Sequence, residues 1–235
     1  MDSTVKAFQG DKKLPLRSPL AKAEKRLIDW LVPRFPPWIE GYHLTLTTIL
    51  WSAGLILFGY LARGSLHWLW LASLMLALQW FTDCFDGALG RYRDTGIPKW
   101  GYFMDHFLDF VFMCSALLGY ALLFDGLHRL LFLILIPIFG AFMVNSYLSF
   151  AATSEFKITF LGTGPTELRL ALIVLNTAII FFGTVFVRKA LPFALPPAGI
   201  VLVVVVFRTQ KYIWHIDMED KRRRTCLVEG RKSMP

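Results

Sequence analysis

Four aspartates with helical spacing lie at the edge of apolar segments, where they could bind cations. Asp83 and Asp86 are three residues apart, and Asp105 and Asp109 are four apart, so each pair can share one helix face. Carboxylate oxygens without a zinc-like His or Cys cluster favour hard cations, Mg²⁺ first and Mn²⁺ or Ca²⁺ next. One uncompensated Asp at the centre of a membrane helix costs about 2.5–3.5 kcal/mol. We therefore expect positive charge to bind between the two pairs.

Three glycines and one arginine accompany these aspartates. Gly87, Gly90 and Gly101 each omit a Cβ and leave room for a ligand to lie against the backbone. Arg91 carries a planar guanidinium that suits phosphate oxygens. Cations, an arginine for phosphate and room for a flat base are together typical of a site for a nucleotide diphosphate.

The composition indicates an integral membrane protein. Of the 235 residues, 55% are hydrophobic and 18% are charged, whereas soluble domains carry about 25% charged residues. A helix needs roughly 20 residues to cross the hydrocarbon layer. We predict an all-α polytopic protein with six transmembrane helices, in the segments 44–62, 64–82, 100–124, 130–154, 170–187 and 190–207.

The distribution of Lys and Arg predicts the orientation. Residues 1–43 and 208–235 hold eight each, and the loops 87–99 and 155–169 hold three and two, against four in the alternate loops. Because Lys and Arg are enriched on the cytoplasmic side, we expect both termini and the four aspartates there. The net charge of +8 then indicates attraction to anionic lipid head groups, and no nucleic-acid module is visible.

The expected domain organisation has three parts. Residues 1–43 form a cytoplasmic tail with an amphipathic interfacial helix, 44–207 form the six-helix transmembrane domain that carries the four aspartates, and 208–235 form a basic, disordered cytoplasmic tail. The apolar face of the interfacial helix is predicted to contain Leu20, Ala23, Leu27, Trp30 and Leu31.

The pattern Asp83-x-x-Asp86-Gly87-x-x-Gly90-Arg91, then nine residues, then Gly101-x-x-x-Asp105-x-x-x-Asp109 resembles the signature of the CDP-alcohol phosphatidyltransferases, D-x2-D-G-x2-A-R-x8-G-x3-D-x3-D. It departs from that signature in having Gly90 in place of alanine and a spacer one residue longer. The resemblance implies a transferase with two Mg²⁺ or Mn²⁺ ions that moves a substituted phosphate from a CDP-linked donor to an alcohol and releases CMP. It also implies a homodimer and a role in phospholipid biosynthesis.

The resemblance assigns roles to the motif residues. The implied metal ligands are Asp83, Asp86, Asp105 and Asp109. The implied contacts to the CDP moiety are Gly87, Gly90, Gly101 and Arg91. Asp109 and the neighbouring His106 remain alternative general bases for the acceptor hydroxyl.

Two features favour a particular donor. His106 follows the third motif acid, and the element Gly164-Pro165-Thr166-Glu167 resembles one in the choline and ethanolamine phosphotransferases. The favoured reaction joins a CDP-linked polar head group to a diacylglycerol-like lipid, with Glu167 and Arg169 as candidate contacts to the head group or a phosphate. CDP-diacylglycerol as donor to a small polar alcohol is one alternative. A non-catalytic cation-binding transporter or channel is the other.

Overall fold

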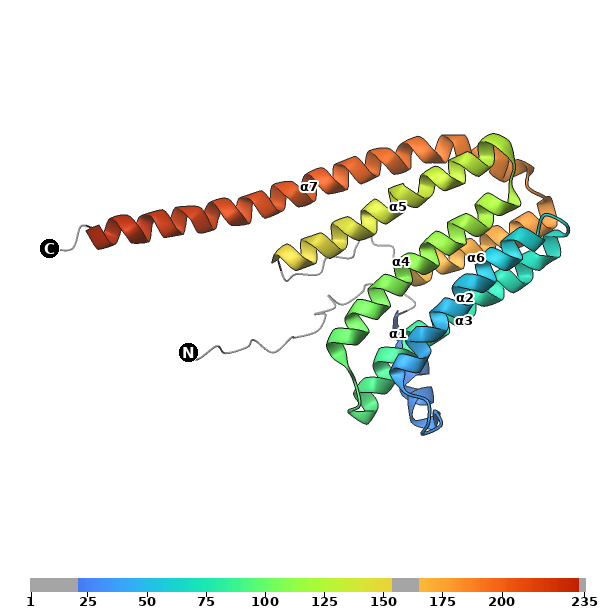
Figure 1. Ribbon diagram of the computed structural model, residues 1–235, viewed down its shortest axis with the longest axis horizontal. Coiled ribbons are helices and arrows are strands. Elements are labelled where there is room, and N and C mark those ends of the chain that lie inside the picture. Colours follow the sequence, from blue (N-terminus) through green and yellow to red (C-terminus); the bar gives the residue numbers. More distant parts are fainter. Residues whose placement is uncertain (1–20, 154–164, 233–235) are drawn as a thin grey trace.

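The computed structural model describes residues 21–153 and 165–232, and within these ranges it describes the side chains of 24–153 and 165–225. Every regular element in these ranges is a helix, which confirms the all-α class (Figure 1). The α-helices are α1 (Ala21–Leu31), α2 (Gly41–Leu61), α3 (Leu69–Arg93), α4 (Pro98–Leu123), α5 (Gly126–Thr153), α6 (Pro165–Phe182) and α7 (Val185–Lys232), and two 3₁₀ helices are η1 (Val32–Arg34) and η2 (Leu66–Trp68).

Five of the described helices, α2, α4, α5, α6 and α7, are long and apolar enough to cross a membrane. The prediction had six. The segment that falls short is α3, because Gln79, Asp83 and Asp86 interrupt its apolar run. These polar residues belong to the site described below.

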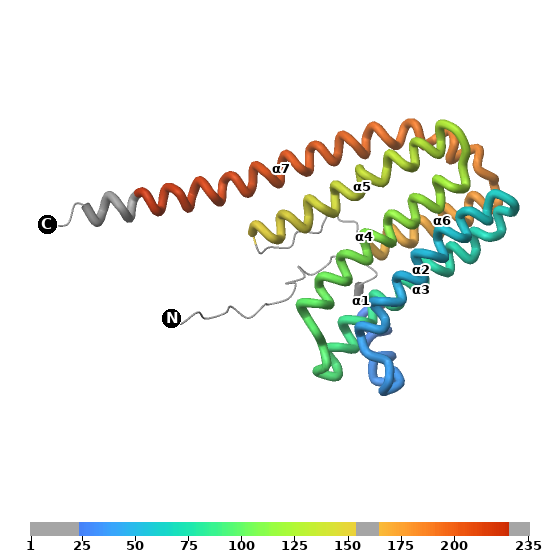
Figure 2. The backbone as a smooth tube through the Cα atoms, in the orientation of Figure 1, coloured from blue at the N-terminus to red at the C-terminus, as the bar shows by residue number. Residues whose placement is uncertain are grey.

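The long helices pack against one another in the order α6, α3, α2, α4, α5 and α7. Helix α2 packs against both α3 and α4, α6 packs against α3, and α5 lies between α4 and α7, as the tube in Figure 2 also shows. The short connection between Asp86 and Trp100 predicts that α3 and α4 are antiparallel neighbours. In the structure both are supported mainly by α2.

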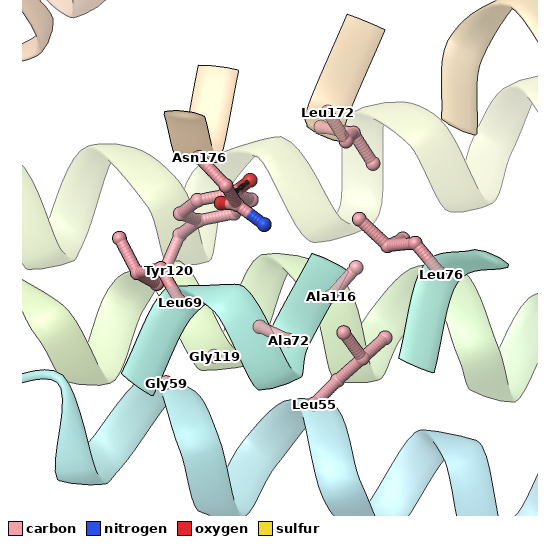
Figure 3. Close-up of a pocket in the computed structure, with 10 residues that line it drawn as sticks. All are labelled: Leu55, Gly59, Leu69, Ala72, Leu76, Ala116, Gly119, Tyr120, Leu172 and Asn176. Carbon is pink, nitrogen blue, oxygen red and sulfur yellow. Dashed lines mark hydrogen bonds between the residues drawn. The ribbon is translucent and has the colours of Figure 1, made fainter. Parts of the chain in front are cut away.

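Two glycines let α2 and α4 cross in backbone contact (Figure 3). A Cβ on Gly59 would lie 2.5 Å from the Cα of Gly119, and a Cβ on Gly119 would lie 2.7 Å from the carbonyl oxygen of Leu55. No side chain fits at either position without moving a helix. The crossing therefore fixes how α4 lies on α2.

A buried polar network joins α3, α4 and α6. The Tyr120 hydroxyl donates to Asn176 Oδ1 at 2.6 Å, and Asn176 Nδ2 donates to Ser73 Oγ at 3.0 Å, beside the small cavity drawn in Figure 3. Because Asn176 and Arg169 are seven residues apart on α6, they lie on the same helix face. The network thus sets the rotation of α6 that turns Arg169 inward.

Helix α1 packs on the end of α3 that carries the aspartates. Leu27, Ile28 and Leu31 contact the cluster around Phe85 and Leu89. The expected helix in residues 1–43 is therefore present as α1. Leu20 lies outside the described residues, and the position of α1 at a membrane interface stays a prediction.

Helix α7 is longer than expected. It continues without interruption through residues 208–232, so the prediction of a disordered tail is wrong for that segment. Residues 208–229 contain neither Gly nor Pro, and extending a helix that has already formed costs little. In Figures 1 and 2 the end of α7 projects beyond α5.

Candidate metal-binding site

A short connection brings the two aspartate pairs to the same end of the bundle. Helix α3 ends at Arg93, the C-cap residue Asp94 has a left-handed backbone with φ of 55°, and α4 starts with Pro98 at its first position. Both are ordinary helix end signals, since Asp tolerates this conformation and Pro suits the first turn. The chain therefore reverses within residues 94–97, and α4 returns along α2.

Three of the four aspartates converge. One carboxylate oxygen from each of Asp83, Asp105 and Asp109 lies within 4.8 Å of the others. Asp83 comes from α3 and the other two from successive turns of α4. All three are half-buried, so their charges are only partly screened by water.

Arg169 of α6 is paired with this cluster. Its Nη1 lies 3.0 Å from Asp83 Oδ2, and its Nη2 lies 3.5 Å from Asp109 Oδ1. The residue is only 7% exposed. Sequence reasoning placed Arg169 at the site as a contact for a phosphate or head group, but it did not foresee that the guanidinium joins an acid of α3 to an acid of α4.

Asp86 is held separately, one turn along α3. Its Oδ2 accepts a hydrogen bond from Thr45 Oγ1 of α2 at 2.7 Å. Gly41, the first residue of α2, lies directly against the Asp86 carbonyl and leaves no room there for a Cβ. Helix α2 therefore orients the fourth acid, a role that no local pattern in the sequence indicated.

Gln79 is a further residue that the motif did not include. It lies one turn before Asp83 on α3, is 1% exposed, and donates from Nε2 to Asp109 Oδ1 at 3.4 Å. A signal was present in the sequence, because Gln79 and His67 are the strongly polar side chains in the apolar segment 64–82, and Gln79 shares the helix face of Asp83.

His106 lies against aromatic residues beside the cluster. Its ring centroid lies 4.2 Å from the ring centroid of Tyr102 and 5.2 Å from that of Tyr147. The Tyr102 carbonyl oxygen is 2.8 Å from Nδ1, and Asp105 Oδ2 is 3.8 Å from the same nitrogen. Because a carbonyl only accepts, Nδ1 carries the hydrogen and Nε2 is left as the basic nitrogen of the neutral ring.

The motif glycines have different surroundings. A Cβ on Gly87 would lie 3.1 Å from Arg91 Nη1, so the guanidinium lies over this glycine. Gly90 is buried, and its Cβ side faces Gly96 in the connection to α4 at 3.3 Å, which is a packing reason for a glycine there. Gly101 has open space in that direction.

A groove beside Arg91 is formed by α1, η1 and the end of α3. Its volume is about 450 Å³, and Arg91, Tyr92 and Lys25 are among the side chains that line it. Glu24 of α1 also lies near the site, where its Oε2 accepts from Thr166 Oγ1 at 3.4 Å. Glu167 follows on α6 and is half-buried. Gly164, part of the Gly-Pro-Thr-Glu element, lies outside the described residues.

The cluster suits a divalent cation. Three carboxylates carry up to three negative charges, and Arg169 supplies one positive charge to them. Partly buried like charges repel strongly unless they are neutralised. Carboxylate oxygens are donors that suit a hard divalent cation rather than a softer metal.

Comparison with known proteins yields one match. A sequence model described as CDP-alcohol phosphatidyltransferase matches residues 42–209, which is more than half of the chain and runs from α2 into α7. No curated protein and no solved structure matches the chain.

Proposed function

Because this chain belongs to the CDP-alcohol phosphatidyltransferase family, we propose that it transfers a substituted phosphate from a CDP-linked donor to an alcohol acceptor, releases CMP, and acts in phospholipid biosynthesis. The observation that carries the proposal is the convergence of Asp83, Asp105 and Asp109 beside a buried arginine. Anionic side chains at such density are useful where cations and phosphates must be held together.

The proposed cofactors are two Mg²⁺ or Mn²⁺ ions. Asp83, Asp86, Asp105 and Asp109 are the residues that would hold them. When bound, such ions neutralise the pyrophosphate and stabilise the negative charge on the departing nucleotide. The protein then has to position the donor and acceptor for in-line transfer.

The chain's own residues suit this positioning. Arg91, which lies over Gly87, would bind the donor phosphates with its planar fork. Arg169 is already at the acids and would contact the transferred phosphate or the head group. Asp109, inside the cluster, is one candidate to take the proton from the acceptor hydroxyl, and Nε2 of His106 is the other.

The proposed placement in the membrane has six spans. Helix α3 is taken as the sixth because it packs along α2 and α6, which are both long and apolar enough to span. Both termini and the site would be cytoplasmic, with α1 at the interface, so a lipid can reach the acids from the bilayer while a nucleotide arrives from water. A homodimer remains an expectation from the family resemblance.

The favoured donor is a polar head group linked to CDP, and the favoured acceptor is a diacylglycerol-like lipid. One support is His106, which lies beside Asp105. The other is the start of α6, where Thr166 is followed by Glu167, two residues before Arg169. The alternative is transfer from CDP-diacylglycerol to a small polar alcohol. Both reactions release CMP, so one assay can compare them.

The test is CMP release by purified protein with Mg²⁺ across CDP-choline, CDP-ethanolamine and CDP-diacylglycerol, each with candidate acceptors. Asp83→Asn should abolish turnover, because it removes a charge from the cluster. Asp94→Asn is the matched control and should retain activity, since Asp94 is exposed and Asn also adopts its left-handed backbone. Full CMP release in excess EDTA contradicts metal dependence. Absence of CMP release with every donor, while metal binding persists, favours the cation-binding transporter or channel.

A further inference from the structure

Gln79 is a buried polar residue whose own bonding is incomplete. Its side chain is 1% exposed, and its Oε1 has no hydrogen-bond partner among the described residues. A buried amide without its full set of partners is destabilising, and a methionine of similar length would avoid that cost. The fold by itself therefore gives little reason for a glutamine at this position.

The remaining contact of Gln79 is with an acid of the cluster. Its Nε2 donates to Asp109 Oδ1 at 3.4 Å, and Arg169 Nη2 approaches the same oxygen at 3.5 Å. Two donors from α3 and α6 thus meet at one oxygen atom of α4. This arrangement limits rotation of the Asp109 carboxylate about its side-chain bonds.

We propose that Gln79 is a positioning residue, which holds the Asp109 carboxylate in the orientation that binds a divalent cation. The inference rests on the metal site proposed above. Partners of this kind, one step behind a metal ligand, typically change metal affinity by about 10–100-fold when they are removed. Gln79 thus acts through Asp109 and contacts neither the CDP-linked donor nor the alcohol acceptor.

The experiment measures Mn²⁺ binding to the purified full chain by electron paramagnetic resonance, with thermal unfolding in EDTA run in parallel. Gln79→Met removes both the donor and the unpartnered acceptor. We expect its Kd for Mn²⁺ to rise at least about 10-fold, while the unfolding temperature in EDTA is unchanged or higher. A purely structural role gives the reverse, a lower unfolding temperature with unchanged affinity.

Two further variants separate position from polarity. Gln79→Asn keeps the amide but shortens it by one methylene, so it should also lose affinity, and it decides the question if the methionine variant does not fold. Ser115→Ala, on the same helix as Asp109, removes a buried hydroxyl that donates to the Val111 carbonyl oxygen and should leave Mn²⁺ affinity unchanged, whatever its effect on stability. If Gln79→Met and Gln79→Asn both keep a Kd for Mn²⁺ within twofold of the parent's, the inference about Gln79 is overturned and the proposed metal site stands. A parent protein that binds no Mn²⁺ overturns the proposed metal site itself.

Discussion

Replacement of Arg169 by Met should destabilise the metal-free protein far more than the metal-loaded protein. Arg169 is 7% exposed and pairs with Asp83 and Asp109. Removal of one partner from a buried ion pair costs about 3–5 kcal/mol. The two aspartate side chains are 24% and 32% exposed, so we take the lower end, about 3 kcal/mol. For a chain of this size that loss corresponds to a fall of about 6–12 °C in unfolding temperature.

Saturating Mg²⁺ should offset most of this loss. A divalent cation replaces the missing positive charge, and removing Arg169 also removes a repulsion, so the variant should bind Mg²⁺ more tightly than the parent. At saturation the difference from the parent falls by RT ln of the ratio of the two Kd values, so a variant that binds Mg²⁺ about 100-fold more tightly than the parent regains about 2.7 kcal/mol, which is close to the expected loss. Turnover should still fall, since the guanidinium is no longer present to contact a phosphate.

Tryptophan fluorescence during heating, in EDTA and in excess Mg²⁺, measures both states. Arg63→Met is the matched control. Its ion pair with Asp125 is exposed, with 43% and 64% of the side chains accessible, so the loss should stay below about 1 kcal/mol in either buffer. An equal loss in EDTA and in Mg²⁺ for Arg169→Met, or no loss in EDTA, would refute the role of Arg169 as the counter-charge of the cluster.

Three further predictions concern the nucleotide, the base and the helix crossing. Arg91→Lys should weaken binding of the CDP-linked donor substantially, measured by titration calorimetry, because a lysine lacks the planar fork; unchanged affinity would make Arg91 a surface charge. His106→Ala should lower transfer by at least about 100-fold with nucleotide affinity retained, while His128→Ala at the other end of the bundle should not, and full activity of the first variant would leave Asp109 as the base. Gly119→Ala should lower the free energy of unfolding, whereas Gly199→Ala, which has open space, should leave it unchanged or raise it by up to about 1 kcal/mol through helix propensity; equal shifts in unfolding temperature would contradict the close crossing.

The sequence predicted the parts of the site that depend on local spacing. Asp105 and Asp109 are one turn apart on one helix, and the turn from Asp94 to Pro98 has ordinary end signals, so their approach to Asp83 followed from short-range geometry. The family assignment depended on the same short segment and is confirmed by the match over residues 42–209.

The contacts between distant segments could not be predicted in this way. Arg169 is 60 residues from Asp109, and Thr45 is 41 residues from Asp86, so these pairings depend on how the helices pack. The helical end of α7 was missed for another reason. A charged segment was interpreted as disordered from its composition, although without Gly or Pro it can extend a helix that already exists.

The contact between Gly59 and Gly119 has a mechanical consequence for the acids at the other end of α4. Asp105 is fourteen residues from Gly119 along the helix, a lever arm of about 21 Å. If α4 tilted by about 1° around this crossing, Asp105 would move by about 0.4 Å relative to α2 and the α3 packed on it. Metal–ligand distances tolerate only about 0.2 Å. The rigidity of the contact between Gly59 and Gly119, about 21 Å away along α4, therefore limits how accurately the acids are placed. A looser crossing would lower cation affinity before it unfolded the protein.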